Sequence, residues 1–194
     1  MAVAVQTMTD EQRKSVALEY LKAFDNGGVT STGASILELF AEDAQVHFPK
    51  WGVANGRDEI GRMFGEVGGR LKAIRHDYAS FNWIMTGTDT FACEGTSHGD
   101  HRDGPWRAGV THAGRWCDVF EVRDHLIQRC FIYLDPDYAG LDTDRYGWLG
   151  ADDRAQLDLA AIPDIEAERQ DVDFLEASRA ELEQMRDAIR PIAR

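Results

Sequence analysis

Apolar residues recur at helical spacing through the N-terminal part of the chain and alternate with polar residues after it. Thr9 and Gln12 have the three-residue separation of a capping box, and apolar positions then repeat every three or four residues as far as Phe24. A short apolar run predicts a second helix over residues 34–41. Residues 56–71 carry apolar side chains at the i, i+3, i+4 and i+7 positions of a third helix. The pattern therefore predicts three N-terminal helices.

Strand-forming residues dominate the following stretch, and turn residues divide it into hairpins. Thr86 and Gly87 mark one turn, and the run from Arg123 to His125 marks another. Strands are expected over residues 45–48, 74–85, 88–97, 106–110, 114–122 and 126–134. Helices followed by a long antiparallel meander predict an α+β fold with a curved antiparallel sheet.

The same pattern divides the chain into three parts. Residues 1–9 are expected to be a flexible N-terminal tail, and residues 10–135 to form one folded domain. Residues 136–194 form a C-terminal extension, in which an apolar stripe predicts an amphipathic helix at about 164–190. That helix is expected to pack on the domain or on a partner subunit.

Charge and cysteine content narrow the function classes. The 194 residues include 21 Lys and Arg against 34 Asp and Glu, a net charge of −13 that opposes contact with nucleic acid or anionic lipid. No apolar run approaches the roughly 20 residues of a membrane span, and the first residues lack the features of a secretory leader. The three cysteines have no CxxC spacing and are typical of a reducing compartment. We therefore expect a cytoplasmic protein with no nucleic-acid or membrane partner.

Four sequence segments, in this order, resemble one superfamily. They are LEYLKAFDNGG, LFAEDAQVHFPKWGVANGRDEIGRMF, RHDYASFNW and GRWCDVFEVRDHLIQRCFIYLD. Over residues 10–135 the chain resembles the nuclear-transport-factor-2-like superfamily and, within it, the SnoaL-like polyketide cyclases. The resemblance implies a cone, in which a bent antiparallel sheet surrounds an apolar pocket that the helices close. It also implies a homodimer formed through the outer face of the sheet.

The resemblance to the dehydratases of this superfamily assigns a catalytic pair. Asp25, at the end of the first helix, and His76, at the start of the first long strand, stand where those enzymes have an aspartate and a histidine. A carboxylate bonded to one ring nitrogen fixes the histidine tautomer and leaves the other nitrogen free to accept a proton. The alternative is an aspartate in a turn and a solvated histidine.

Asp118 matches the position that SnoaL-like cyclases use as general acid and base. If Asp118 faces the pocket, strand alternation turns Trp116 and Phe120 inward as well, and this apolar setting raises the pKa of its carboxyl. The alternative is an exposed carboxylate paired with Arg115 or Arg129.

Aromatic residues supply the candidate pocket lining. The predicted substrate-binding residues are Tyr20, Phe24, His47, Phe48, Trp51, Trp83, Trp116, Phe120 and Tyr133. Phe24 and Phe48 stand at the approximate positions where the resemblance to scytalone dehydratase implies tyrosines that hold a water, so that way of activating a carbonyl is missing there. Tyr20, Tyr78 and Tyr133 are the candidates to supply a hydroxyl instead. The histidines and aspartates at 98, 100, 101, 103 and 112 are metal-capable but are typical of an exposed loop or edge strand. We expect no metal and no cofactor.

These observations predict a cofactor-independent lyase (a dehydratase) or an isomerase or cyclase that acts on a small hydrophobic cyclic molecule. His76 would be the base, Asp25 its orienting partner, and Asp118 the acid. One alternative is an epoxide hydrolase like limonene-epoxide hydrolase, for which Asp118, Arg115 and Arg129 offer the groups. Another is a non-catalytic ligand-binding or structural subunit.

Overall fold

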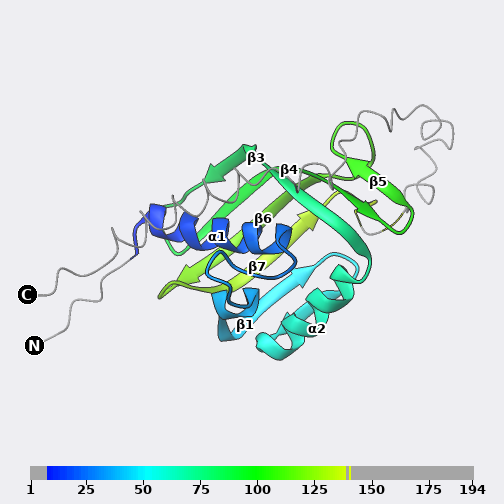
Figure 1. Cartoon of the computed structure of the whole chain (residues 1–194). Helices are drawn as coiled ribbons and strands as arrows, with labels where there is room; N and C mark the ends of the chain where they lie inside the picture. The colour runs from blue at the N-terminus through cyan, green and yellow to red at the C-terminus, as the bar shows by residue number, and fades with distance from the viewer. Residues whose placement is uncertain (1–7, 139, 141–194) are drawn as a thin grey trace, which may run out of the picture.

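The computed structural model describes residues 8–138 and 140, which form an α+β domain (Figure 1). Along the chain, helix α1 (Asp10–Asp25) is followed by a short 3-10 turn η1 (Ile36–Leu39) and by strands β1 (Phe40–Phe48) and β2 (Gly52–Asn55). Helix α2 (Gly56–Gly68) comes next, and the strands that follow it are β3 (Leu71–Ile84), β4 (Thr90–His101), β5 (Gly104–Arg107), β6 (Arg115–Arg123) and β7 (Leu126–Leu134). The predicted helix at about 164–190 and residues 1–7 of the predicted N-terminal tail lie outside the described residues.

The described strands form one curved sheet in the order β2-β1-β7-β6-β4-β3, with β5 paired to β4. Each neighbouring pair is antiparallel except β1 and β7, which run parallel, so the sheet is mixed rather than purely antiparallel. Strand alternation reports which face a residue occupies but not the direction of a distant partner, and the sequence pattern therefore missed this pairing.

From residue 8 onward, the N-terminal region contains two α-helices rather than the predicted three. The helix expected over residues 34–41 is reduced to the single turn η1, and Phe40 already begins β1. A short apolar run is compatible with a buried strand as well as with a helix. Here Phe40 and Ala41 begin a strand, in which both side chains are buried. The third predicted helix ends at Gly68, so Leu71 starts β3 instead.

The inner face of the sheet packs on the helices, and this layer forms the core. Figure 1 shows α1 crossing the sheet, where it contacts β3, β6 and β7, while α2 packs on β1 and β2. Tyr20 of α1 meets Phe40 and Phe120 edge-on, with ring centroids 5.8 Å apart in both pairs. These contacts fix α1 above the middle of the sheet.

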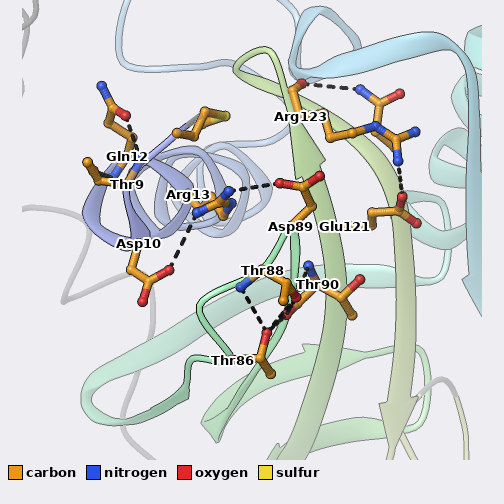
Figure 2. Close-up of polar contacts among 12 residues, drawn as sticks. Thr9, Asp10, Gln12, Arg13, Thr86, Thr88, Asp89, Thr90, Glu121 and Arg123 are labelled. Atoms are coloured by element: carbon orange, nitrogen blue, oxygen red, sulfur yellow. Dashed lines mark hydrogen bonds and ion pairs between the residues drawn. The ribbon is translucent and has the colours of Figure 1, made fainter. Parts of the chain in front are cut away.

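The N-terminus of α1 is anchored by polar contacts (Figure 2). Thr9 and Gln12 form the predicted capping box through reciprocal backbone contacts. The Arg13 guanidinium, 4% exposed, reaches Asp89 in the β3–β4 turn at 2.8 Å and Asp10 at 3.5 Å. A buried cation with two carboxylate partners holds this end of the helix to the sheet edge, and the opposite end of α1 then meets β3 at Asp25.

No helix among the described residues is long and apolar enough to cross a membrane.

Candidate active site

Asp25 and His76 are in direct contact. Asp25 is the last residue of α1 and His76 lies on the inner face of β3, and both side chains are buried. Nδ1 of His76 lies 2.6 Å from Oδ1 of Asp25. The backbone N–H of His76 also donates to both carboxylate oxygens, at 3.2 and 3.1 Å. The Asp25 carboxylate therefore orients the His76 ring and is itself held by the backbone N–H of His76.

This contact fixes how the imidazole is presented. A proton on Nδ1 makes the hydrogen bond to Asp25, which leaves Nε2 of His76 with a lone pair. Among the described residues, no hydrogen bond to Nε2 is found, and His76 lines a pocket. The arrangement thus directs a proton-accepting nitrogen into an apolar space.

Tyr78 completes the surroundings of Asp25. It lies two residues beyond His76 on β3, and its hydroxyl donates to Oδ2 of Asp25 at 2.6 Å. Burial, followed by the charge of Asp25, raises the pKa of the Tyr78 phenol, so that the group stays a hydrogen-bond donor. Both carboxylate oxygens therefore have donors from side chains as well as from the backbone.

Asp118 faces the same pocket from β6. Its cross-strand neighbours on the inner face are Cys93 of β4 and Ile132 of β7, with Trp116 and Phe120 on either side along its own strand. This apolar frame leaves the carboxyl 4% exposed, and no hydrogen bond to its side chain is found within the described part of the chain. Burial raises the pKa of Asp118 from its ordinary 3.8 to about 7, with the nearby His76 opposing part of the change.

A pocket lies between α1 and the sheet. It is lined by Tyr20, Leu21, Phe24, Phe48, Ile74, His76, Ser97, Trp116, Asp118, Ile132, Leu134 and Tyr138. Its empty volume, with the open mouth included, is about 330 Å³. The pocket is narrow, and aromatic rings form much of its wall. Four predicted lining residues are present in it, namely Tyr20, Phe24, Phe48 and Trp116.

The other predicted lining residues lie outside that lining, for identifiable reasons. His47 and Tyr133 project from the outer face of the sheet, where their rings are 6.1 Å apart and Tyr133 is 52% exposed. Phe120 faces inward but lies deeper, beneath Tyr20. Trp83 packs on Phe91, with ring centroids 6.3 Å apart.

Trp51 follows β1 and lies behind Phe48 rather than in the pocket. Its indole is edge-on to the Phe48 ring at 5.6 Å, and Nε1 donates to Glu66 of α2 at 3.2 Å. The Arg70 guanidinium lies 5.9 Å from its ring centroid. Trp51 therefore supports Phe48, which lines the pocket, but does not line the pocket itself.

Sequence reasoning missed Tyr138 and Ser97. Tyr138 lies just after β7, in a segment without apolar periodicity that was assigned to the C-terminal extension. Ser97 pairs with His76 across β3 and β4 and faces inward beside it. The cross-strand register, which shifts between Asp77 and Asn82 of β3, places Ser97 next to the histidine, and the turn alone does not reveal this pairing.

Three of the five metal-capable residues lie in an inner strand of the sheet rather than in an exposed loop or an edge strand. His98, Asp100 and His101 belong to β4, and both histidines are buried. Nδ1 of His101 accepts a hydrogen bond from the backbone of Asp103 at 3.0 Å. Within the described residues, no three His, Cys, Asp or Glu side chains are arranged to hold a metal ion.

Comparison with known proteins places this geometry in a family. The SnoaL-like domain family matches residues 17–130, whereas no protein of curated function matches the sequence. A nuclear-transport-factor-2-like protein from Anabaena variabilis is 20% identical with a TM-score of 0.54, covering 71% of this chain and 100% of its own. A protein from Catenulispora acidiphila with a ketosteroid isomerase-like fold, solved with trimethylamine, is 15% identical with a TM-score of 0.53, covering 71% of this chain and 98% of its own.

A proposed polyketide cyclase from Silicibacter sp. is 17% identical with a TM-score of 0.50, covering 66% of this chain and 91% of its own. At such identities the structural matches establish the fold and leave the activity to the site. The family match covers more than half of the chain. The chain belongs to the SnoaL-like domain family, with the nuclear-transport-factor-2-like fold.

Proposed function

We propose that the protein is a cofactor-independent acid–base enzyme, a dehydratase or an isomerase or cyclase, for a small hydrophobic cyclic molecule. The observation that carries the proposal is the 2.6 Å contact between Asp25 and Nδ1 of His76, which leaves Nε2 facing the pocket that also contains Asp118. Structural neighbours called polyketide cyclase or ketosteroid isomerase-like support the same broad class.

The proposed reaction begins with proton removal. Nε2 of His76 accepts a proton from a carbon next to a carbonyl group, and the electron pair of the broken C–H bond moves toward the carbonyl oxygen. Asp25 then faces an imidazolium, whose positive charge its carboxylate stabilises. General-base catalysis by a positioned histidine typically contributes about 10² to 10⁴ in rate.

Asp118 supplies the acid in the second step. With its pKa raised to about 7, a substantial fraction of the carboxyl carries a proton near neutral pH. In a dehydratase that proton goes to a departing hydroxyl group, water leaves, a carbon–carbon double bond forms, and the proton on His76 is returned to Asp118 through solvent. In an isomerase His76 returns its proton to a different carbon of the same substrate.

The charges of the pocket restrict the substrate. Of the described residues that line it, none is lysine or arginine, whereas Asp118 contributes a carboxyl group and Asp25 lies directly behind His76. An anionic substrate would enter an apolar space next to these carboxylates without a compensating cation. We therefore propose an uncharged substrate, recognised by aromatic walls and a few hydroxyl groups.

The epoxide hydrolase alternative has less support. That chemistry needs an arginine between two carboxylates, yet Arg115 is engaged with Asp135 at 3.1 Å and 70% exposed, and Arg129 lies 3.9 Å from Glu121. Neither arginine lines the pocket. A non-catalytic ligand-binding role fits the narrow pocket but gives no account of the paired Asp25 and His76.

Hydrogen exchange in heavy water tests the proposal without the natural substrate. The protein is incubated with 2-tetralone, and deuterium incorporation next to the carbonyl is followed by mass spectrometry. Water loss from 3-hydroxycyclohexanone, followed by ultraviolet absorbance, distinguishes a dehydratase. We expect incorporation that is lost in His76→Ala and retained in His125→Asn, a control in the exposed β6–β7 turn. Equal incorporation in all three proteins, or none in any, contradicts the proposal.

A further inference from the structure

Tyr138 lines the pocket from the segment that follows β7, the last strand of the sheet. We propose that Tyr138 is a specificity-determining residue, whose ring forms one end of the pocket and limits the length of the bound ligand, and whose hydroxyl selects ligands with an oxygen at that end. The inference deepens the proposed function, because it concerns the ligand of the same pocket. Tyr138 lies outside residues 17–130, the part of the chain that the family match covers.

The turn that carries Tyr138 is attached to the sheet by its backbone. The N–H of Asp135 donates to the carbonyl of Arg115 at 3.1 Å, and the N–H of Asp137 donates to the carbonyl of His112 at 3.1 Å. The Asp135 carboxylate accepts from the backbone and the Nε of Arg115. With these contacts at the start of β6 and just before it, Tyr138 is held as an extension of the pocket wall.

The ring of Tyr138 is supported from behind. It packs between Phe48 and Trp106, with a centroid distance of 5.6 Å to each ring. Trp106 is 1% exposed and approaches Gly99 so closely that a Cβ there would lie 2.4 Å from its Cζ2 atom. The Tyr138 ring therefore has no space into which it can retreat, and a longer ligand meets it as a fixed wall.

The Tyr138 hydroxyl is available to a ligand. No hydrogen bond to this hydroxyl is found within the described part of the chain, although Tyr138 is 4% exposed. Burial, with the charges of Asp118 and Asp25, raises the pKa of the phenol and keeps it protonated. Because the hydroxyl has no hydrogen-bond partner among the described residues, a ligand oxygen that accepts its proton gains affinity over a ligand that lacks such an oxygen.

Fluorescence binding of four aromatic probes tests both parts of the inference. Naphthalene and 2-naphthol have two rings, and pyrene and 1-hydroxypyrene have four. All variants are made in the His76→Ala background, because binding then does not depend on catalysis. The parent is expected to bind 2-naphthol at least about tenfold more tightly than 1-hydroxypyrene. In Tyr138→Ala that preference is expected to disappear or reverse.

Tyr138→Phe separates the hydroxyl from the ring. This variant is expected to keep the preference for probes with two rings. Its affinity for 2-naphthol is expected to fall by about tenfold, while its affinity for naphthalene stays the same. Tyr133→Phe and Tyr133→Ala are the matched controls, because Tyr133 is 52% exposed on the outer face of the sheet. Melting temperatures verify folding, and Tyr138→Leu replaces Tyr138→Ala if the alanine variant is unfolded.

An unchanged order of probe affinities in Tyr138→Ala or Tyr138→Leu overturns the inference, as does the absence of binding by every probe to every variant. These outcomes differ from failure of the proposed function. If deuterium exchange is absent in the unmutated protein while the probe preferences shift as expected, the pocket binds ligands as inferred and the catalytic proposal alone is refuted.

Discussion

The carboxylate of Asp25 and the imidazole of His76 connect the end of α1 to β3, with 2.6 Å between Oδ1 and Nδ1. A carboxylate at the C-terminus of a helix opposes the helix dipole and is unfavourable on its own. Here it accepts hydrogen bonds from the His76 backbone, the His76 ring and the Tyr78 hydroxyl. These three donors offset the unfavourable position, and they explain why an aspartate stands there.

Asp25→Asn is expected to lower the deuterium exchange rate by about 10² to 10⁴. An amide in place of the carboxylate stabilises the imidazolium poorly and permits the other tautomer of His76. Tyr78→Phe removes one donor to Asp25 and is expected to have a smaller effect, about tenfold. Exchange rates are compared with those of Asp43→Asn, an exposed aspartate on β1. A rate for Asp25→Asn equal to that control would exclude an orienting role.

Asp118 is expected to make the protein less stable as the pH rises from about 4 to about 7. The folded carboxyl, with its pKa raised to about 7, holds its proton after the unfolded one has lost it, so the unfolded state binds fewer protons in this range. The difference corresponds to roughly 4 kcal/mol in the free energy of unfolding at most. This contribution is fully present below the unfolded pKa and is lost once the pH exceeds the folded pKa.

Asp118→Asn removes that dependence. The free energy of unfolding of Asp118→Asn minus that of the unmutated protein is expected to increase as the pH rises from about 4 to about 8. Urea unfolding at several pH values measures this difference. Asp124→Asn, in the exposed β6–β7 turn, serves as the control and is expected to follow the unmutated protein. Parallel pH curves for Asp118→Asn and the unmutated protein would show that Asp118 titrates normally.

Gly95 leaves room for the Trp116 ring that lines the pocket. A Cβ at this position would lie 2.8 Å from Cζ2 of Trp116 and 3.0 Å from Phe81. Gly95→Ala is therefore expected to lower the free energy of unfolding by about 1 to 3 kcal/mol. Gly65→Ala, in an exposed position of α2 with open space around it, is expected to raise it by about 0.5 to 1 kcal/mol. Thermal unfolding of both variants checks the contrast, and equal effects would contradict it.

The outer face of the sheet is proposed to pair two copies of the chain. Val53 and Tyr133 are about half exposed on this face, and His47 lies between them in the strand order. Tyr133→Lys places a charge there and is expected to shift a dimer to a monomer in light-scattering measurements. Val29→Lys, an exposed apolar residue outside the sheet, is the control. A monomeric unmutated protein would rule out this pairing.

Local pattern predicted the hairpins well, since β7 occupies the predicted residues 126–134 and β6 differs by one residue at each end. Pattern failed where distant contacts decide the structure. Phe40 belongs to a strand because it packs under Tyr20, and β1 runs parallel to β7 because of where the chain returns to the sheet. Neither relationship leaves a periodic signal in the sequence.

For the site, strand alternation predicted the face of a residue but not its depth. Trp116, Asp118 and Phe120 share the inner face as expected, yet Phe120 lies beneath Tyr20 and does not reach the pocket. His47 alternates to the outer face because Phe48, its neighbour, faces inward. Tyr138 had no periodic neighbours, so only the fold reveals it as a lining residue.

The state of the His76 ring tests the central claim most directly, because it needs no substrate. Nitrogen NMR of the protein labelled in its histidines, with His76→Gln to assign the signals, identifies the protonated nitrogen at about pH 8. The account predicts a proton on Nδ1, a strongly deshielded proton signal from the bond to Asp25, and loss of that signal in Asp25→Asn. A ring whose proton lies on Nε2 alone would contradict the account.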